Sequence, residues 1–152
     1  MKILMVCLGN ICRSPIAEGV MGQKAKAHGL DWEVASAGTG SYHIGSAPHQ
    51  HSQEICKLHG VDIAGQRAQQ FSKSDLVTYD KIYAMDTSVY SDLMHIAKHT
   101  PHADKLMLFL DELGEAKEQS VPDPYYGGKE GYTHVYELID RTCDKIIDKY
   151  NK

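Results

Sequence analysis

Long apolar runs and stretches of a single charge sign are both missing from this 152-residue sequence. The apolar segment nearest the N-terminus covers only residues 2–6, which is too short for the apolar part of a secretory signal or for a membrane span. The net charge of −4 provides no general attraction to nucleic acid or to an anionic membrane. We therefore expect no nucleic-acid partner and no membrane partner.

Cysteine is scarce as well, and its distribution indicates a compartment. The four cysteines lack the dense spacing of a small secreted domain that is held together by disulfides. A chain of this length can bury a core without disulfides or metals. We expect one domain over residues 1–152, located in the reducing environment of the cytoplasm. The cysteines are Cys7, Cys12, Cys56 and Cys143.

The common cofactor motifs are also absent. The sequence has neither the glycine-rich loop followed by Lys and Ser or Thr that binds nucleotides, nor the three-glycine turn that binds dinucleotides. Cys7 and Cys12 are separated by four residues, whereas a redox pair of the thioredoxin type has two residues between its cysteines. No second Cys/His pair has the spacing of a metal site. We expect no cofactor and no bound metal.

Short apolar segments alternate with helical patterns along the chain. The apolar segments are continuous rather than alternating, as is typical of parallel strands covered on both faces. This order predicts an α/β fold, a three-layer sandwich with a four-stranded parallel sheet of the flavodoxin-like, doubly wound type. The predicted strands cover residues 2–6, 33–36, 81–85 and 105–109. The predicted helices cover residues 15–28, 48–59, 72–78, 87–98 and 131–150.

Cys7 follows the first predicted strand, in a segment that reads Cys-Leu-Gly-Asn-Ile-Cys-Arg-Ser-Pro over residues 7–15. Ligands of such folds bind beyond the carboxyl ends of the strands. Inward-pointing N–H groups of the loop and the dipole of the next helix favour an anion, and Arg13 can clamp it with two hydrogen bonds. The same field favours a thiolate. The segment therefore predicts an oxyanion site with a nucleophile at its base.

The residues around Cys7 suggest how the loop is built. Gly9 permits a tight turn, and Asn10 can adopt a left-handed conformation or brace the loop through its amide. Ser14 offers a hydroxyl to the Cys7 sulfur, and it also stands where the N-cap of the next helix belongs, ahead of Pro15.

Residues 7–15 resemble the signature loop of the low-molecular-weight protein tyrosine phosphatases. Asp123-Pro124-Tyr125-Tyr126 and residues 36–40 resemble two further elements of that family, in the same order. The resemblance implies hydrolysis of phosphotyrosine, an aryl phosphate monoester, through a phosphocysteine intermediate. Cys7 would be the nucleophile, Arg13 the phosphate clamp, and Asp123 the acid that protonates the leaving oxygen and then activates water.

The resemblance assigns roles to further residues. The substrates implied are phosphotyrosine proteins or peptides, with phosphate and similar oxyanions as product or inhibitor. A disulfide between Cys12 and Cys7 under peroxide is also implied, which would protect the nucleophile. The remaining assignments are a phosphate-binding loop of Leu8, Gly9, Asn10, Ile11, Cys12 and Ser14, a substrate rim of Tyr42, Tyr125 and Tyr126, and loop supports Ser36 and Gln66.

Three other functions remain open for the same loop. Protein-arginine phosphatases have Thr in place of Ile11 and Phe in place of Tyr125, so both residues here favour an aryl ester. Thioredoxin-linked arsenate reductases need a relay of further cysteines, and no closely spaced pair follows the third predicted strand. A non-catalytic phosphotyrosine-binding module would lack the cysteine or the acid, whereas both Cys7 and Asp123 are present.

Overall fold

The strands form one parallel sheet in the order β2-β1-β3-β4, which confirms the predicted four-stranded α/β architecture. The computed structural model describes residues 1–115, 120–125 and 127–151. The strands are shorter or longer than predicted by one or two residues at their ends. They are β1 (Lys2–Cys7), β2 (Glu33–Gly38), β3 (Lys81–Ala84) and β4 (Leu106–Leu108).

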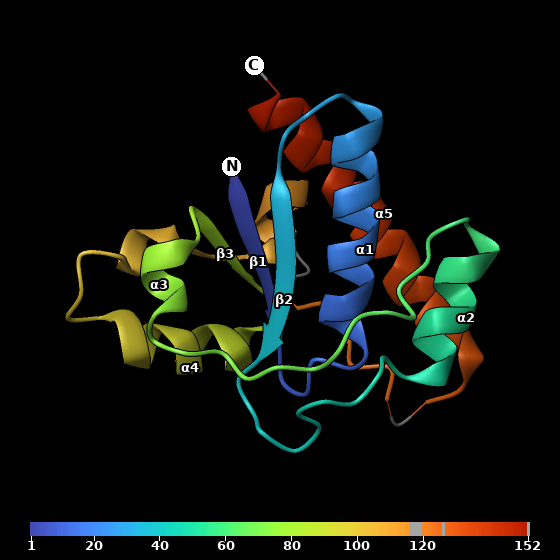
Figure 1. The fold of residues 1–152 in the computed structure, drawn as a ribbon, viewed down its shortest axis with the longest axis horizontal. Helices are drawn as coiled ribbons and strands as arrows, with labels where there is room; N and C mark the ends of the chain where they lie inside the picture. Colours follow the sequence, from blue (N-terminus) through green and yellow to red (C-terminus); the bar gives the residue numbers. More distant parts are fainter. Residues whose placement is uncertain (116–119, 126, 152) are drawn as a thin grey trace.

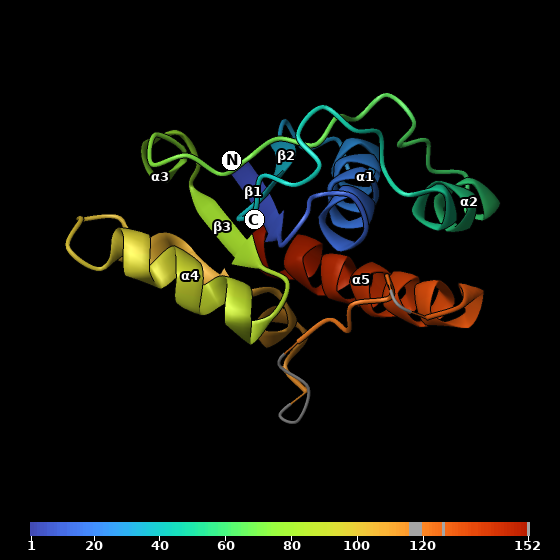
Figure 2. The same ribbon diagram turned by 90° about the horizontal axis from the view of Figure 1, so that it is seen from below.

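Helices cover both faces of the sheet, so that the molecule has three layers (Figures 1 and 2). On one face α1 packs against β1, β2 and α5, and α2 packs beside α1 and α5. On the other face α4 packs against β3 and β4. The α-helices are α1 (Arg13–Ala27), α2 (Gln50–Leu58), α3 (Asp75–Thr78), α4 (Thr87–Ala97) and α5 (Lys129–Tyr150). Two short 3₁₀ helices, η1 (Ala103–Lys105) and η2 (Phe109–Leu113), flank β4.

The central strand β1 divides its side chains between two cores, because successive residues of a strand point to opposite faces. Ile3 and Met5 belong to the core beneath α1 and α5, whereas Leu4 and Val6 belong to the core beneath α4. Cys7 continues the first series and lies on the α1 side of the sheet. This alternation delivers the thiol to the N-terminus of α1.

The start of α1 corrects one prediction. The helix begins at Arg13, two residues before the predicted start, and no side chain caps it. Ser14 is therefore not the N-cap; its hydroxyl lies 3.0 Å from the Cys7 sulfur instead. The predicted end holds, since Gly29 follows the helix with a φ of 69°, the left-handed conformation that glycine adopts without strain.

The short helix α3, in contrast, begins later than predicted, at Asp75 rather than Ser72. The carboxylate of Asp75 accepts a hydrogen bond from the backbone N–H of Ser72 at 2.9 Å, which holds the preceding residues in a turn. The other helices agree with their predicted ranges to within one or two residues at each end.

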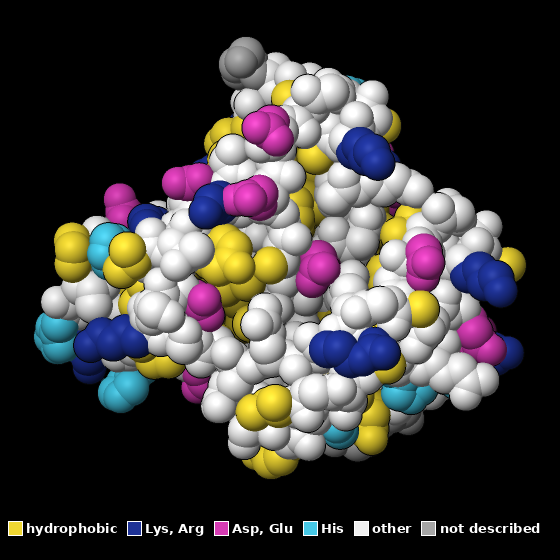
Figure 3. Space-filling model, in the orientation of Figure 1, with side chains coloured by type: hydrophobic (Ala, Val, Ile, Leu, Met, Phe, Trp, Pro, Cys, Tyr) yellow, Lys and Arg dark blue, Asp and Glu magenta, His cyan; other side chains and the backbone are white. Residues whose placement is uncertain are grey.

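None of the helices in the described ranges is both long and apolar enough to cross a membrane. Acidic and basic side chains are interspersed on the face drawn in Figure 3. Hydrophobic side chains gather at the lower edge of that face, over the loop that follows β2 (Figures 1 and 3). This is also the edge at which β1 ends, so apolar surface adjoins the loop that contains Cys7.

Candidate active site

The loop after β1 bends back over its own cysteine. Asn10 has a φ of 57° and directs its backbone N–H to the Cys7 sulfur at 3.3 Å. Asn10 thus adopts the left-handed conformation that the sequence allowed for it, whereas Gly9 does not. The loop also requires Gly38 on β2, because a Cβ there would lie 2.7 Å from the Leu8 carbonyl oxygen.

A chain of buried polar side chains supports the nucleophile from below. The Asn10 amide donates to the hydroxyls of Ser14 at 2.8 Å and Ser36 at 2.9 Å. Because the Ser14 oxygen accepts this bond, its own hydrogen is available to the Cys7 sulfur 3.0 Å away. Ser36 in turn donates to Glu18 at 2.6 Å, and burial raises the pKa of that carboxyl group. The arrangement aims one hydroxyl donor at the sulfur.

Of the two predicted supports, Ser36 contacts Asn10 and Gln66 does not serve that purpose. Gln66 donates its amide to the carbonyl oxygen of Pro15 at 3.1 Å, which ties it to the first turn of α1. The carbonyl oxygen of the Asn10 side chain accepts instead from the backbone N–H of Gln69 at 2.9 Å. A backbone donor leaves no signal in the side-chain pattern, so the sequence could not identify it.

Arg13 is buried and fixed by two acceptors from distant parts of the chain. One nitrogen of its guanidinium, Nη1, donates to Asp86 at 2.6 Å and to the carbonyl oxygen of Val121 at 3.0 Å. The other, Nη2, lies 3.8 Å from the Asp123 carboxylate. Burial alone would lower the pKa of Arg13, but the Cys7 sulfur and the Asp86 carboxylate outweigh burial and raise it. The guanidinium is therefore a permanent, oriented cation.

Asp86 follows β3 and was not among the residues that the sequence assigned to the site. Its Oδ1 accepts from the backbone N–H of Val89 at 2.7 Å, which caps α4, while its Oδ2 binds Arg13. One carboxylate thus joins the beginning of α4 to the anion clamp. The two residues are 73 positions apart, and only the fold brings them together.

The loop that contains Asp123 is attached to the sheet by backbone bonds. The N–H of Val121 donates to the carbonyl oxygen of Met85 at 2.7 Å, directly beyond β3. Two residues further on, the Asp123 carboxylate accepts from the backbone N–H of Tyr125 at 3.0 Å. The Asp123 side chain remains 38% exposed, so it faces both the Arg13 guanidinium and solvent.

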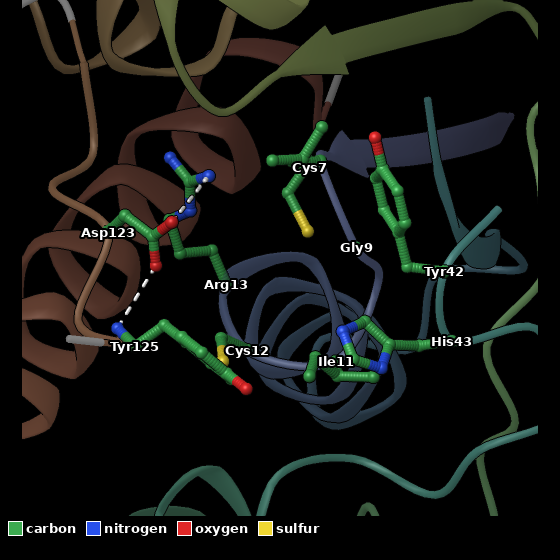
Figure 4. A pocket seen from close by; sticks show the side chains of 10 residues that line it. Cys7, Gly9, Ile11, Cys12, Arg13, Tyr42, His43, Asp123 and Tyr125 are labelled. Atoms are coloured by element: carbon green, nitrogen blue, oxygen red, sulfur yellow. Dashed lines mark hydrogen bonds and ion pairs between the residues drawn. The ribbon is translucent and has the colours of Figure 1, made fainter. Parts of the chain in front are cut away.

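These parts enclose one cavity of about 380 Å³ (Figure 4). The thiol of Cys7 points into the cavity between two walls, with Arg13 and Asp123 on one side and Tyr42 and His43 on the other. His43 is a wall residue that the sequence did not single out. Tyr126, predicted for the rim, lies outside the described residues. The lining is formed by Cys7, Leu8, Gly9, Ile11, Cys12, Arg13, Tyr42, His43, Asp123 and Tyr125.

The second cysteine of the loop has a separate environment. The Cys12 sulfur lies 3.4 Å from the hydroxyl of Tyr132 on α5, within hydrogen-bond distance for sulfur. Burial raises the pKa of Cys12 to about 11, so this residue is a thiol at neutral pH. The sequence contained no signal for Tyr132, which is 120 residues away.

A thiol, a fixed guanidinium and a carboxyl group around one anion-sized cavity, at the carboxyl edge of a parallel sheet, define the site type of cysteine-dependent phosphatases. The family model for low molecular weight phosphotyrosine protein phosphatase matches residues 2–152. The chain belongs to this family.

Individual relatives agree with this assignment. The low molecular weight protein-tyrosine-phosphatase YfkJ of Bacillus subtilis is 39% identical, with 99% of this chain and 96% of YfkJ covered. The crystal structure of a protein tyrosine phosphatase from Entamoeba histolytica superposes with a TM-score of 0.94 at 35% identity, covering 99% of this chain and 97% of the other. A Drosophila arginine phosphatase has the same TM-score of 0.94 at 33% identity, covering 100% and 99%.

Proposed function

We propose that this protein hydrolyses phosphotyrosine in proteins or peptides, with Cys7 as nucleophile, Arg13 as phosphate clamp and Asp123 as general acid and base. The observation that carries the proposal is the single cavity on which the Cys7 sulfur, the Arg13 guanidinium and the Asp123 carboxyl group converge. Its volume of about 380 Å³ is at the lower end of the range typical of small-ligand sites.

In the first step the Cys7 thiolate attacks phosphorus and the bond to the ester oxygen breaks. The backbone N–H of Asn10 and the hydroxyl of Ser14 stabilise the sulfur anion, at 3.3 Å and 3.0 Å. The N-terminus of α1, at which the loop ends, favours the phosphate dianion. The fixed orientation of Arg13 means that little reorganisation is needed when charge shifts to the phosphoryl oxygens.

Asp123 completes both steps. Its proton passes to the departing phenolic oxygen. In the second step the Asp123 carboxylate takes a proton from water, the water oxygen attacks phosphorus, and the phosphorus–sulfur bond breaks. Phosphate leaves, and the Cys7 thiolate is regenerated together with the protonated acid.

The walls of the cavity support an aryl substrate over phosphoarginine. Tyr42, His43 and Tyr125 present rings at the mouth, and Ile11 presents an apolar side chain. A phenyl ring can pack against these groups, whereas a guanidinium would lose hydration without gaining a polar partner from Ile11. The similarity to an arginine phosphatase makes phosphoarginine the second candidate substrate.

The test compares three substrates under the same conditions: the reduced protein is assayed for turnover of p-nitrophenyl phosphate, of phosphotyrosine and of phosphoarginine. We expect the two aryl esters to be hydrolysed in preference to phosphoarginine, and C7S to abolish turnover. D123A should slow phenyl phosphate about 10²–10⁴-fold and affect esters with better leaving groups less. Absence of aryl phosphatase activity with Cys7 reduced, or equal losses for all leaving groups in D123A, would contradict the proposal.

Two further parts of the proposal concern cell location and oxidation. The need for reduced Cys7, together with four free thiols in the structure, supports the cytoplasm, and the match over residues 2–152 supports one domain. Peroxide would oxidise Cys7 to a sulfenic acid, and attack by the Cys12 sulfur would release water and form a Cys7–Cys12 disulfide. Reducing thiols would reverse this step.

A further inference from the structure

A second cavity lies between α2 and the first turns of α5. Its volume is about 460 Å³, and its apolar lining includes Ile55 and Leu58 from α2 and Tyr132 from α5. The two helices lie side by side in both ribbon views (Figures 1 and 2) and contact each other directly. Leu58 is 80% exposed, an unusual position for a leucine next to an open groove.

Three charged side chains line this groove: Glu54 and Lys129 have opposite charges, and Lys57 adds a second positive charge. The Oε1 atom of Glu54 lies 2.9 Å from His51 Nδ1 and 3.9 Å from Lys129 Nζ. Lys129 belongs to α5 and Glu54 to α2, so the ion pair joins the two walls. The groove therefore offers apolar contact without a strong net charge and favours an apolar side chain.

The ring of His49 lies between the groove and the mouth of the catalytic cavity. The His49 ring stacks on Tyr132 with centroids 5.4 Å apart and meets Tyr125 edge-on at 5.8 Å. Tyr125 lines the catalytic cavity and Tyr132 lines the groove. The separation of these two tyrosine rings cannot exceed the two distances combined, which is about three residues of extended peptide.

The connecting surface is itself suited to an apolar chain. Burial, and then the neighbouring His51, lower the pKa of His49, so the bridging ring is uncharged at neutral pH. The other groups that face His49 are the Tyr125 and Tyr132 rings and the Glu54 carboxylate, which opposes the shift. A peptide that leaves the catalytic cavity in this direction meets the rings of Tyr125 and His49 before it reaches the groove, whereas Tyr132 is buried beneath His49.

We propose that the groove between α2 and α5 is a subsite for the peptide substrate, which binds an apolar side chain about three to five residues from the phosphotyrosine. The inference rests on the proposed function, because the occupant is the same chain whose phosphotyrosine enters the catalytic cavity. It adds a specificity determinant that lies outside the phosphate-binding loop and its aromatic rim.

The test uses phosphotyrosine peptides in which one leucine is moved through five positions on each side, in an otherwise serine-rich sequence. We expect kcat/KM to rise about 10-fold when the leucine stands three to five residues away on one side, as partial burial of a leucine side chain allows. L58D, and T133E on the facing wall, should remove this preference. V77D, which changes another exposed apolar residue, on α3, should retain it.

The outcomes separate the subsite from the enzyme activity. Turnover of p-nitrophenyl phosphate, which has no side chain to reach the groove, serves to normalise each variant, and its absence in the wild type would overturn the proposed function. Normal turnover with equal kcat/KM for all leucine positions would overturn the subsite. So would full retention of the leucine preference in both L58D and T133E. A wild-type dimer that L58D converts to a monomer would assign the groove to a second copy of the chain instead.

Discussion

The carboxylate of Asp86 has two donors to satisfy, and replacing it with asparagine separates its two tasks. Its oxygens accept from the Val89 backbone at 2.7 Å and from Arg13 at 2.6 Å. An asparagine has only one acceptor oxygen. In D86N that oxygen can retain the helix cap, since Asn and Asp cap equally well, and the amide nitrogen then faces the guanidinium donors. D86A removes both bonds.

The magnitudes follow from the exposure of the two partners. The Arg13 side chain is 4% exposed and the Asp86 side chain 19%, so the bond is only partly shielded from water. We expect D86N to lower the free energy of unfolding by about 2 kcal/mol, the loss of one hydrogen bond to a charged group. D86A should cost about 1 kcal/mol more because the cap of α4 is lost as well. With Arg13 no longer fixed, kcat/KM should fall about 10- to 100-fold.

Urea unfolding followed by the fluorescence of Trp32, the single tryptophan, measures the stability change. Inhibition by inorganic phosphate and kcat/KM for p-nitrophenyl phosphate measure how well Arg13 binds the phosphate group. D92N, at an exposed position of α4, is the matched control and should alter neither quantity. If D86N lost stability but bound phosphate and turned over substrate as the wild type does, Asp86 would be a structural residue only, and the assigned orienting role would be refuted.

Four further variants test other parts of the structure. G38A should lower the free energy of unfolding by about 2 kcal/mol and should also lower activity, because the added Cβ would lie 2.7 Å from the backbone of the loop. G22A is its control: a Cβ at this position has no atom within 4 Å, so the substitution should stabilise α1 by up to about 1 kcal/mol. E112Q should lose about 2 kcal/mol at neutral pH through the bond to Lys149, and the difference should shrink as the pH falls below the ordinary carboxyl pKa of about 4.3. C12S should make inactivation by peroxide irreversible by thiols, whereas the wild type should recover.

The pH dependence of E112Q has a definite sign. Burial would raise the pKa of Glu112, but its hydrogen bonds with Tyr83 and Lys149 outweigh burial and lower it. A carboxyl group whose pKa is lower in the folded state stabilises the protein above its unfolded pKa, and this stabilisation is lost as the pH falls through the folded pKa. A constant difference between wild type and E112Q from pH 7 to pH 3 would contradict this assignment. Unchanged activity in G38A would contradict the packing argument, and a wild type that thiols cannot reactivate would contradict the disulfide.

Most of the architecture could be predicted because strands and helices alternate along the chain, and each strand is marked by an apolar run of the expected length. The prediction was weakest where a side chain had two possible partners. Ser14 is a residue type that often caps helices and stands at the expected N-cap position, but in the structure its hydroxyl bonds with Cys7 and Asn10. The spacing of residues along the chain cannot reveal which of two bonds a hydroxyl makes, since that choice depends on groups assembled by the fold.

The site shows the same division between local and distant information. The loop from Cys7 to Arg13 is continuous in sequence, so its composition and its place after a strand were sufficient to predict an anion site. The contacts of Arg13 with Asp86 and Val121 span 73 and 108 residues. Gln66 illustrates the limit, because an amide can reach several acceptors and the sequence does not state that it reaches Pro15.

The backbone contacts of Val121 affect how the loop that contains Asp123 is placed when substrate binds. Its N–H extends the edge of β3 by one bond to Met85, and its carbonyl oxygen binds Arg13, so both of its polar backbone groups are engaged before any ligand arrives. The backbone two residues before the proposed acid is thereby set by folding and not by substrate binding. We therefore expect that no lid has to close over the site to bring the proposed acid to the phosphate.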